Sequence, residues 1–168
     1  FDYNKDGYLD LYISDWKACD SNSFYTNNGD GTFTNQIDLF GDVEHKNSLM
    51  SIPFDFNNDG WMDLYLANDV INRTNDLFIN QNGKGFTEES NKYGLNHARN
   101  DMGIAFGDYN NDGFFDMYIT DVLMNPLLTN KGDNTFIDLA VEQGVQSGGW
   151  SWDTVFSDFD LDGDEDLL

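Results

Sequence analysis

One short sequence pattern occurs four times in this chain, at a nearly constant spacing. It is Asp-x-Asn-x-Asp-Gly-x-x-Asp, with Asp in place of Asn in the last copy, and it covers residues 2–10, 55–63, 108–116 and 158–166. We call these segments acidic loops 1 to 4 and number their positions 1 to 9. Their first aspartates lie 53, 53 and 50 residues apart. A period of about 50 residues is typical of propeller blades, so the repeat limits the possible folds more than any other feature.

Apolar segments repeat together with the acidic loops. Short apolar segments precede loops 2 to 4, at residues 50–54, 102–106 and 152–156. Alternating apolar runs follow loops 1 to 3, at residues 9–13, 62–66 and 115–119. Alternation with a period of two, rich in Tyr, Ile and Leu, predicts strands that have one face in the core.

A second turn signal follows each of the first three acidic loops. Asn-Gly or Gly-Asp lies between apolar residues at 25–33, 78–86 and 128–136, which favours tight hairpins. Each repeat then holds four antiparallel strands, as a propeller blade does. We therefore expect an all-β chain, a β-propeller fragment of about three four-stranded antiparallel blades with Ca²⁺-binding hairpin loops. Its expected parts are a blade lacking its first strand at 1–46, complete blades at 47–99 and 100–148, and the start of a further blade at 149–168.

The acidic loops carry oxygen donors in a fixed register. Side chains at positions 1, 3, 5 and 9 and the main-chain carbonyl of position 7 can surround one cation, and Gly at position 6 lets the chain fold back. Hard oxygen donors in a roomy, irregular loop favour Ca²⁺ over the smaller Mg²⁺. The candidate ligands are Asp2, Asn4, Asp6, Tyr8 and Asp10; Asp55, Asn57, Asp59, Trp61 and Asp63; Asp108, Asn110, Asp112, Phe114 and Asp116; and Asp158, Asp160, Asp162, Asp164 and Asp166, the fourth member of each set through its main-chain oxygen only.

The number of carboxylates in each loop favours a cation over an ordinary turn. Three carboxylates in one short loop repel one another, and the four at the donor side-chain positions of loop 4 do so more strongly. A divalent cation converts this repulsion into attraction. An Asn- and Asp-rich turn that binds nothing is the alternative, but a turn needs one or two such residues rather than four in register. We therefore expect up to four structural Ca²⁺ ions.

Another family of Ca²⁺ loops starts in the same way. The EF-hand loop ends with a bidentate Glu at position 12 and is flanked by helices. Position 12 is Ile13, Leu66 or Ile119 in loops 1 to 3, and each lies in an alternating apolar run. Position 9 must then close the site, and the loop must join two strands. A helical dockerin-type loop is excluded on the same grounds.

Net charge excludes several classes of partner. The chain has 31 acidic and 8 basic residues, a formal charge of −23, which repels nucleic-acid phosphates and anionic lipid headgroups. No apolar stretch approaches the roughly 18 residues that a membrane helix needs, and we see no targeting segment. We expect no nucleic-acid binding and no membrane insertion.

Several single residues have ordinary structural explanations. The lone Cys19 is expected to be a buried hydrophobe, and neither His45 nor His97 has a second ligand at zinc spacing. Asn72 fits the N-glycosylation pattern and is expected in a loop. Thr154 lies in a short O-glycosylation-like motif within an expected inner strand, which disfavours modification.

Aromatic and rim residues leave two explanations open. Trp150 and Trp152, with Trp16 and Trp61, could stack on sugars, but packing between sheets is expected to be their main role. Asp15, Asn68 and Asp121 recur directly after the second strand of each repeat. They could line a ligand-binding rim, although capping of a turn is favoured.

The chain resembles the FG-GAP/VCBS repeat family of integrin-α-like propellers. The segment from Phe106 through Gly107 and Asp108 to Gly113, and the turn at residues 28–33, look closest to the secreted subgroup associated with ASPIC/UnbV domains and cartilage-acidic-like proteins. The resemblance covers nearly the whole chain. It implies Ca²⁺ loops between the first two strands of each blade, a structural or adhesive role, and an extracellular location.

Three functional hypotheses follow from these features. The first is a secreted or cell-surface Ca²⁺-binding propeller module that binds a protein or a glycan and has no catalytic site. The second is a structural unit whose blades pair with further blades of the parent chain or with neighbouring copies. The third is a polysaccharide-active enzyme that uses carboxylate pairs, which ranks last because almost every clustered carboxylate is assigned to metal.

Overall fold

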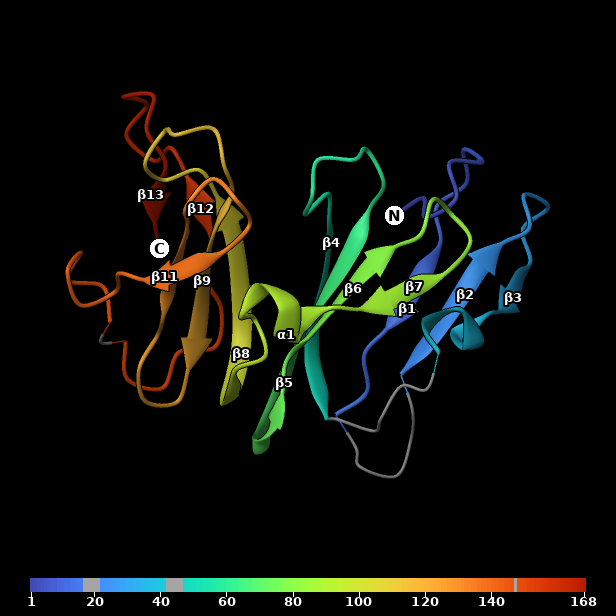
Figure 1. Cartoon of the computed structure of the whole chain (residues 1–168), viewed down its shortest axis with the longest axis horizontal. Helices are drawn as coiled ribbons and strands as arrows, with labels where there is room; N and C mark the ends of the chain where they lie inside the picture. Colours follow the sequence, from blue (N-terminus) through green and yellow to red (C-terminus); the bar gives the residue numbers. More distant parts are fainter. Residues whose placement is uncertain (17–21, 42–46, 147) are drawn as a thin grey trace. The chain divides into compact units, whose positions relative to one another are not determined.

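The computed structural model describes residues 1–16, 22–41, 47–146 and 148–168, so Cys19 and His45 lie outside the described residues. The chain divides into two compact units, Phe1–Ala98 and Arg99–Leu168. Strands make up almost all of the regular structure in both units (Figure 1). The prediction of an all-β chain is confirmed.

Unit 1 contains two antiparallel sheets. The first is the meander β1 (Leu11–Ile13), β2 (Ser23–Asn27) and β3 (Phe33–Asn35). The second runs in the order β4 (Ser48–Phe54), β5 (Asp63–Thr74), β6 (Asp76–Asn80) and β7 (Phe86–Glu88). A short helical turn follows each sheet, η1 (Ile37–Phe40) after β3 and α1 (Ser90–Tyr93) after β7. Strands that are neighbours in sequence therefore pair with each other, as in a propeller blade.

Unit 2 has the same strand order. Its first sheet is β8 (Ala98–Gly107), β9 (Asp116–Asp121), β10 (Leu127–Asn130) and β11 (Phe136–Asp138), and β12 (Phe156–Ser157) then pairs with β13 (Asp166–Leu167). Backbone hydrogen bonds of 3.0 Å between Val155 and Leu168 extend this last pair. Four-stranded antiparallel sheets that follow one another along the chain are consistent with a fragment of a β-propeller.

Each acidic loop connects two chain segments that pair with each other. The residue before loops 2 to 4 pairs with the position 9 aspartate, in the pairs Phe54–Asp63, Gly107–Asp116 and Ser157–Asp166. In loop 1, Phe1 and Asp10 exchange backbone hydrogen bonds of 2.7 and 3.3 Å. All four loops lead into strands, β1, β5, β9 and β13, which excludes the EF-hand and dockerin alternatives.

Aromatic rings from both sheets fill the core of unit 1. Phe24 on β2 is fully buried and lies 5.2 Å from the rings of Tyr3 and Phe40 and 6.1 Å from that of Phe86. Phe40 stacks on Phe86 with 4.1 Å between ring centroids. Tyr3 occupies position 2 of acidic loop 1, so the base of that loop is anchored in the core.

The core of unit 2 is smaller and has the same link to a loop. Buried Tyr118, Leu127 and Ala140 form its centre, and partly buried apolar side chains pack around them. Tyr109, at position 2 of acidic loop 3, stacks in parallel on Phe156 of β12 with 6.4 Å between ring centroids. The loop is therefore held by the sheet that follows it as well as by its own strands.

Glycine ends a helical turn after the last strand of each repeat. The φ angles of Gly41, Gly94 and Gly144 are 72°, 74° and 73°, a positive range that Gly adopts with the least strain. These turns were not among the predicted elements. Their sequence signal is a Gly that recurs at the same place in three repeats.

Two local predictions are wrong. Asn72, expected in a loop, lies within β5, because the β-branched residues Val70, Ile71 and Thr74 favour continuation of the strand. The segment 152–156, expected to be an inner strand, enters regular β structure only at Phe156. Thr154 therefore precedes the strand, and its hydroxyl donates to the carbonyl of Leu168 at 3.0 Å.

Candidate metal-binding loops

The four acidic loops share one backbone conformation. Position 4 has a positive φ in every copy, 58° at Lys5, 56° at Asn58 and Asn111, and 62° at Leu161. Position 6 also has a positive φ, between 84° and 100°, and is always Gly. Asn tolerates the left-handed region and Gly prefers it, whereas Leu161 is strained there by roughly 1 kcal/mol.

Side chains at positions 1, 3 and 5 turn inward and accept the loop's own N–H groups. In loop 2, the two carboxylate oxygens of Asp55 accept from Asp59 at 3.1 Å and from Gly60 at 2.8 Å. Asn57 accepts from Asp59 at 3.0 Å, and Asp59 accepts from Trp61 at 2.8 Å. The same four bonds occur in all four loops, at 2.8 to 3.2 Å. The side chains at positions 1, 3 and 5 therefore fold back onto the backbone of their own loop in every copy.

The position 9 aspartate joins the loop to the hairpin that follows. In loop 2, Asp63 accepts the N–H of Phe56 at 3.0 Å and the N–H of Asn80, at the end of β6, at 2.7 Å. Asn80 in turn accepts from Gly83 in the hairpin at 2.8 Å and donates to the carbonyl of Met62 at 3.0 Å. Asn27 and Asn130 make the equivalent contacts with Asp10 and Asp116.

These three asparagines lie outside the acidic-loop pattern and were not predicted as site residues. Their signal is an Asn placed directly before the hairpin turn in each repeat, at positions 27, 80 and 130. An Asn at this place is expected on turn chemistry alone. The structure assigns this Asn a second role, because it also fixes the carboxylate of position 9.

Burial perturbs the charge of the position 9 carboxylates. Asp63 and Asp116 are fully buried, and Asp10 is 6% exposed. The pKa of Asp63 is raised to about 7 and that of Asp116 to about 6, mainly by burial and also by the other aspartates of the same loop, against the lowering effect of the N–H donors. An ionised carboxylate at either place is therefore costly without a nearby positive charge.

Acidic loop 3 contains a buried oxygen without a hydrogen-bond partner. One carboxylate oxygen of Asp116 accepts the N–H of Asn130 at 2.8 Å, whereas its other oxygen is buried and has no hydrogen-bond partner. The N–H of Tyr109 faces this carboxyl group and lowers its pKa, but it is not placed to form a regular hydrogen bond. A buried carboxylate oxygen without a partner is unfavourable, and a bound cation would satisfy it.

Acidic loop 4 brings three carboxylates together. One oxygen from each of Asp158, Asp160 and Asp166 lies within 4.8 Å of the other two. This loop is the most exposed of the four, and Asp replaces the Asn found at position 3 in loops 1 to 3. Its donor set has the highest negative charge and the least burial.

The residues present fit a hard divalent cation. Carboxylate, carboxamide and main-chain oxygens are the donors that Ca²⁺ takes, and each carboxylate has further lone pairs beyond those used by the loop N–H groups. The internal hydrogen bonds also hold the loop in shape without a cation, as in an Asx-rich turn. The donor chemistry of each loop therefore suits Ca²⁺.

A second repeated network joins a tyrosine to an asparagine. Asn75 donates to the hydroxyl of Tyr65 at 2.9 Å and accepts the N–H of Asn68 at 2.9 Å. Asn125 likewise donates to the hydroxyl of Tyr118 and accepts the N–H of Asp121. In the first repeat, Asn22 accepts the N–H of Asp15. Asn68 and Asp121 are buried, which supports turn capping over a ligand-binding rim for these positions.

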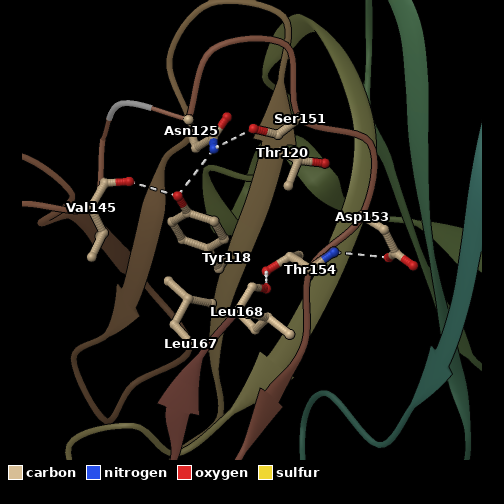
Figure 2. A pocket seen from close by; sticks show the side chains of 10 residues that line it. Tyr118, Thr120, Asn125, Val145, Ser151, Asp153, Thr154, Leu167 and Leu168 are labelled. Carbon is tan, nitrogen blue, oxygen red and sulfur yellow. Dashed lines mark hydrogen bonds between the residues drawn. The ribbon is translucent and has the colours of Figure 1, made fainter.

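A pocket of about 290 Å³ in unit 2 adjoins this network (Figure 2). Tyr118 donates to the carbonyl of Val145 at 2.6 Å, and Asn125 donates to the hydroxyl of Ser151 at 3.2 Å. Figure 2 shows these bonds between the residues that line the pocket, so much of their hydrogen-bonding capacity is used within the protein. The pocket separates the end of β9 from the segment that leads to β12.

Two tryptophans next to this pocket are exposed, contrary to the expectation that they pack in the core. Trp150 and Trp152 are 67% and 65% exposed, and their rings stack at 6.1 Å with 14° between planes. Trp16 is also exposed, and its indole N–H donates to Asp69 at 2.9 Å. Trp61 lies beside Gly83 of the following hairpin, as predicted for a structural ring.

Comparison with known proteins agrees with the repeat. Within the described part of the chain, no helix is long and apolar enough to cross a membrane. No curated protein matches the sequence. Residues 55–119, which contain acidic loops 2 and 3 and the strands after them, match the family model of the FG-GAP-like repeat. The family resemblance is confirmed for this segment, which is similar to the repeats of FG-GAP propellers.

Proposed function

We propose that this chain is part of an extracellular, Ca²⁺-binding β-propeller module that binds a protein or a glycan and does no chemistry of its own. The match of residues 55–119 to the FG-GAP-like repeat supports the repeat module. The shared geometry of the acidic loops supports the cation. The residues that would hold it are those at positions 1, 3, 5, 7 and 9 of each loop.

One observation carries the metal proposal furthest. The carboxyl group of Asp116 is buried, its pKa is raised to about 6, and one of its oxygens has no hydrogen-bond partner. The two other carboxylates of loop 3, Asp108 and Asp112, contribute to this raised pKa. When bound, a divalent cation neutralises these carboxylates and supplies the missing partner.

With a cation bound, each acidic loop would stabilise the folded state. In loops 2 to 4, position 9 is the first residue of a strand and positions 1 to 5 belong to the loop, so a cation held by both ties the loop to its sheet. At a free concentration of about ten times the dissociation constant, each site would add about 1.4 kcal/mol. Extracellular modules bind Ca²⁺ with dissociation constants of roughly 10⁻⁴ to 10⁻³ M, which cytosolic Ca²⁺ would not saturate. This favours an extracellular location.

Calorimetric titration with Ca²⁺ tests the metal. We expect millimolar or tighter binding, a higher Tm in Ca²⁺ than in EGTA, and weaker binding in the Asp116→Asn variant. Asp38→Asn makes the same charge change at an exposed residue of η1 and serves as the control. An unchanged Tm and no heat of binding in the wild type would refute the metal proposal.

The stacked Trp150 and Trp152 are the best candidate contact surface for a partner. Exposed indoles stack on sugar rings and are frequent in the centre of protein interfaces. A Trp150→Ala, Trp152→Ala double variant should lose retention on the glycan or protein that the wild type binds, with its Tm little changed. A structural unit that joins further blades or copies is the alternative, and it predicts concentration-dependent assembly that the same variant weakens.

A further inference from the structure

Neighbouring acidic loops touch each other through fixed loop positions. In unit 2, the side-chain amide of Asn111, at position 4 of loop 3, donates to the carboxylate of Asp164, at position 7 of loop 4, at 2.7 Å. Loops 3 and 4 lie at the same end of that unit (Figure 1). The two residues are 53 positions apart in the sequence, so the contact links consecutive repeats.

Unit 1 has a contact of different chemistry between the same positions. The ammonium group of Lys5, at position 4 of loop 1, lies 4.1 Å from the ring centroid of Trp61, at position 7 of loop 2. A cation over the face of an indole is attracted by the ring. A hydrogen bond in unit 2 and a cation–π contact in unit 1 therefore join equivalent positions of the two loops of each unit.

Position 7 is where such a contact can affect a cation site. Its N–H donates to the position 5 carboxylate, from Trp61 to Asp59 at 2.8 Å and from Asp164 to Asp162 at 3.0 Å. Its carbonyl oxygen is the main-chain ligand of the proposed site. A side chain that holds position 7 therefore holds two donor groups of the neighbouring loop.

The side chain at position 4 should respond to cation binding in its own loop. Asn111 has a φ of 56° and lies between the position 3 and position 5 donors. A cation bound at positions 3 and 5 would fix the backbone on both sides of Asn111. The side chain of Asn111 would then be held in one direction.

We propose that the two acidic loops of each unit bind their cations as a coupled pair, with the position 4 side chain of the first loop acting as a positioning residue for position 7 of the second. This inference rests on the proposed function, since it requires the loops to bind Ca²⁺. Ordering of one loop lowers the ordering cost of the other, which gives positive coupling. The coupling is reciprocal, so each loop raises the affinity of the other by the same factor, about fivefold or more.

Two-dimensional NMR of the full chain during a Ca²⁺ titration resolves the loops. The position 6 glycines report on single sites, because Gly113 and Gly163 each donate to the position 1 aspartate of their own loop, at 2.8 and 3.0 Å. We expect their amide signals to move together in the wild type. In a variant with loop 4 disabled by Asp158→Asn and Asp160→Asn, the midpoint of the Gly113 signal should rise about fivefold.

A double-mutant cycle tests the contact itself. Asn111→Gly preserves the left-handed backbone, and Asp164→Ala removes the partner. Each should weaken the coupling between loops 3 and 4, and the double variant should weaken it no further. Asn58→Gly is the matched control at position 4 of loop 2, because its side chain makes no hydrogen bond to any described residue.

The outcomes separate this inference from the function on which it rests. No shift of any loop glycine in the wild type would overturn the metal proposal. Shifts at independent midpoints, unaffected when the neighbouring loop is disabled, would overturn the coupling and leave the metal proposal standing. If Asn111→Gly raised the Gly113 midpoint and Asn58→Gly raised the Gly60 midpoint by the same factor, backbone freedom, and not the contact with Asp164, would be responsible.

Discussion

Raising the pH should destabilise the metal-free protein. The pKa of Asp63 in the folded state is about 7 and that of Asp116 about 6, both above the value of about 3.9 for an unfolded chain. Between the two values the folded state therefore binds more protons than the unfolded state. Stability then falls as the pH rises, and this fall ends once the folded-state pKa has been passed.

The size of the effect follows from the same pKa values. Between about pH 5.5 and about pH 7.5, Asp63 should contribute a loss of about 2 kcal/mol and Asp116 a loss of about 1 kcal/mol. The free energy of unfolding should therefore fall by about 2–3 kcal/mol. For a chain of this size, that corresponds to a decrease in Tm of about 5–10 °C.

Urea unfolding in EGTA at the two pH values measures this difference. In excess Ca²⁺ the trend should weaken or reverse, because protons and the cation compete for the same carboxylates. Asp63→Asn should remove about 2 kcal/mol of the pH dependence whatever its effect on absolute stability, and Asp38→Asn should not. A metal-free stability that is constant or increases from about pH 5.5 to about pH 7.5 would refute the argument that burial keeps these carboxylates protonated.

Three further substitutions test other parts of the structure by urea unfolding. Asn80→Ala should cost about 2–4 kcal/mol, because it leaves the N–H of Gly83 and the carbonyls of Tyr3 and Met62 without their partner, and a loss under 1 kcal/mol would contradict this role. Phe40→Ala should cost about 3–5 kcal/mol through loss of a buried ring, unlike the exposed Phe115→Ala. Leu161→Asn should stabilise the protein by about 0.5–1 kcal/mol by relieving the left-handed strain, and a destabilised variant would show that this strain is absent.

The sequence was sufficient to predict the strand order and the acidic loops, because both depend on local patterns. Alternating apolar residues and the Gly at position 6 act within a few residues of themselves. The pairing of Phe54 with Asp63 also follows directly, since a short loop between two strands leaves little choice of register. The chemical class of each candidate ligand is likewise a property of the sequence alone.

Other features depend on contacts between distant residues and could not be predicted locally. The exposure of Trp150 and Trp152 is decided by which segments pack beside them, not by their own hydrophobicity. The unsatisfied oxygen of Asp116 does not follow from the repeated pattern either, because in the other three loops the N–H of position 2 donates to the position 9 carboxylate. The link from Asn111 to Asp164 crosses from one repeat to the next, and a pattern within one repeat does not contain it.

The asparagine before each hairpin has a consequence for hydrogen exchange. The N–H groups of Asn27, Asn80 and Asn130 are bound by acidic-loop carboxylates that lie 17, 17 and 14 residues away along the chain. Opening of an acidic loop must therefore release an amide proton in a different strand. Each acidic loop and the hairpin after it should therefore exchange as one cooperative segment. The Asn amide in the third strand of a blade should exchange at the rate at which the loop between the first two strands opens.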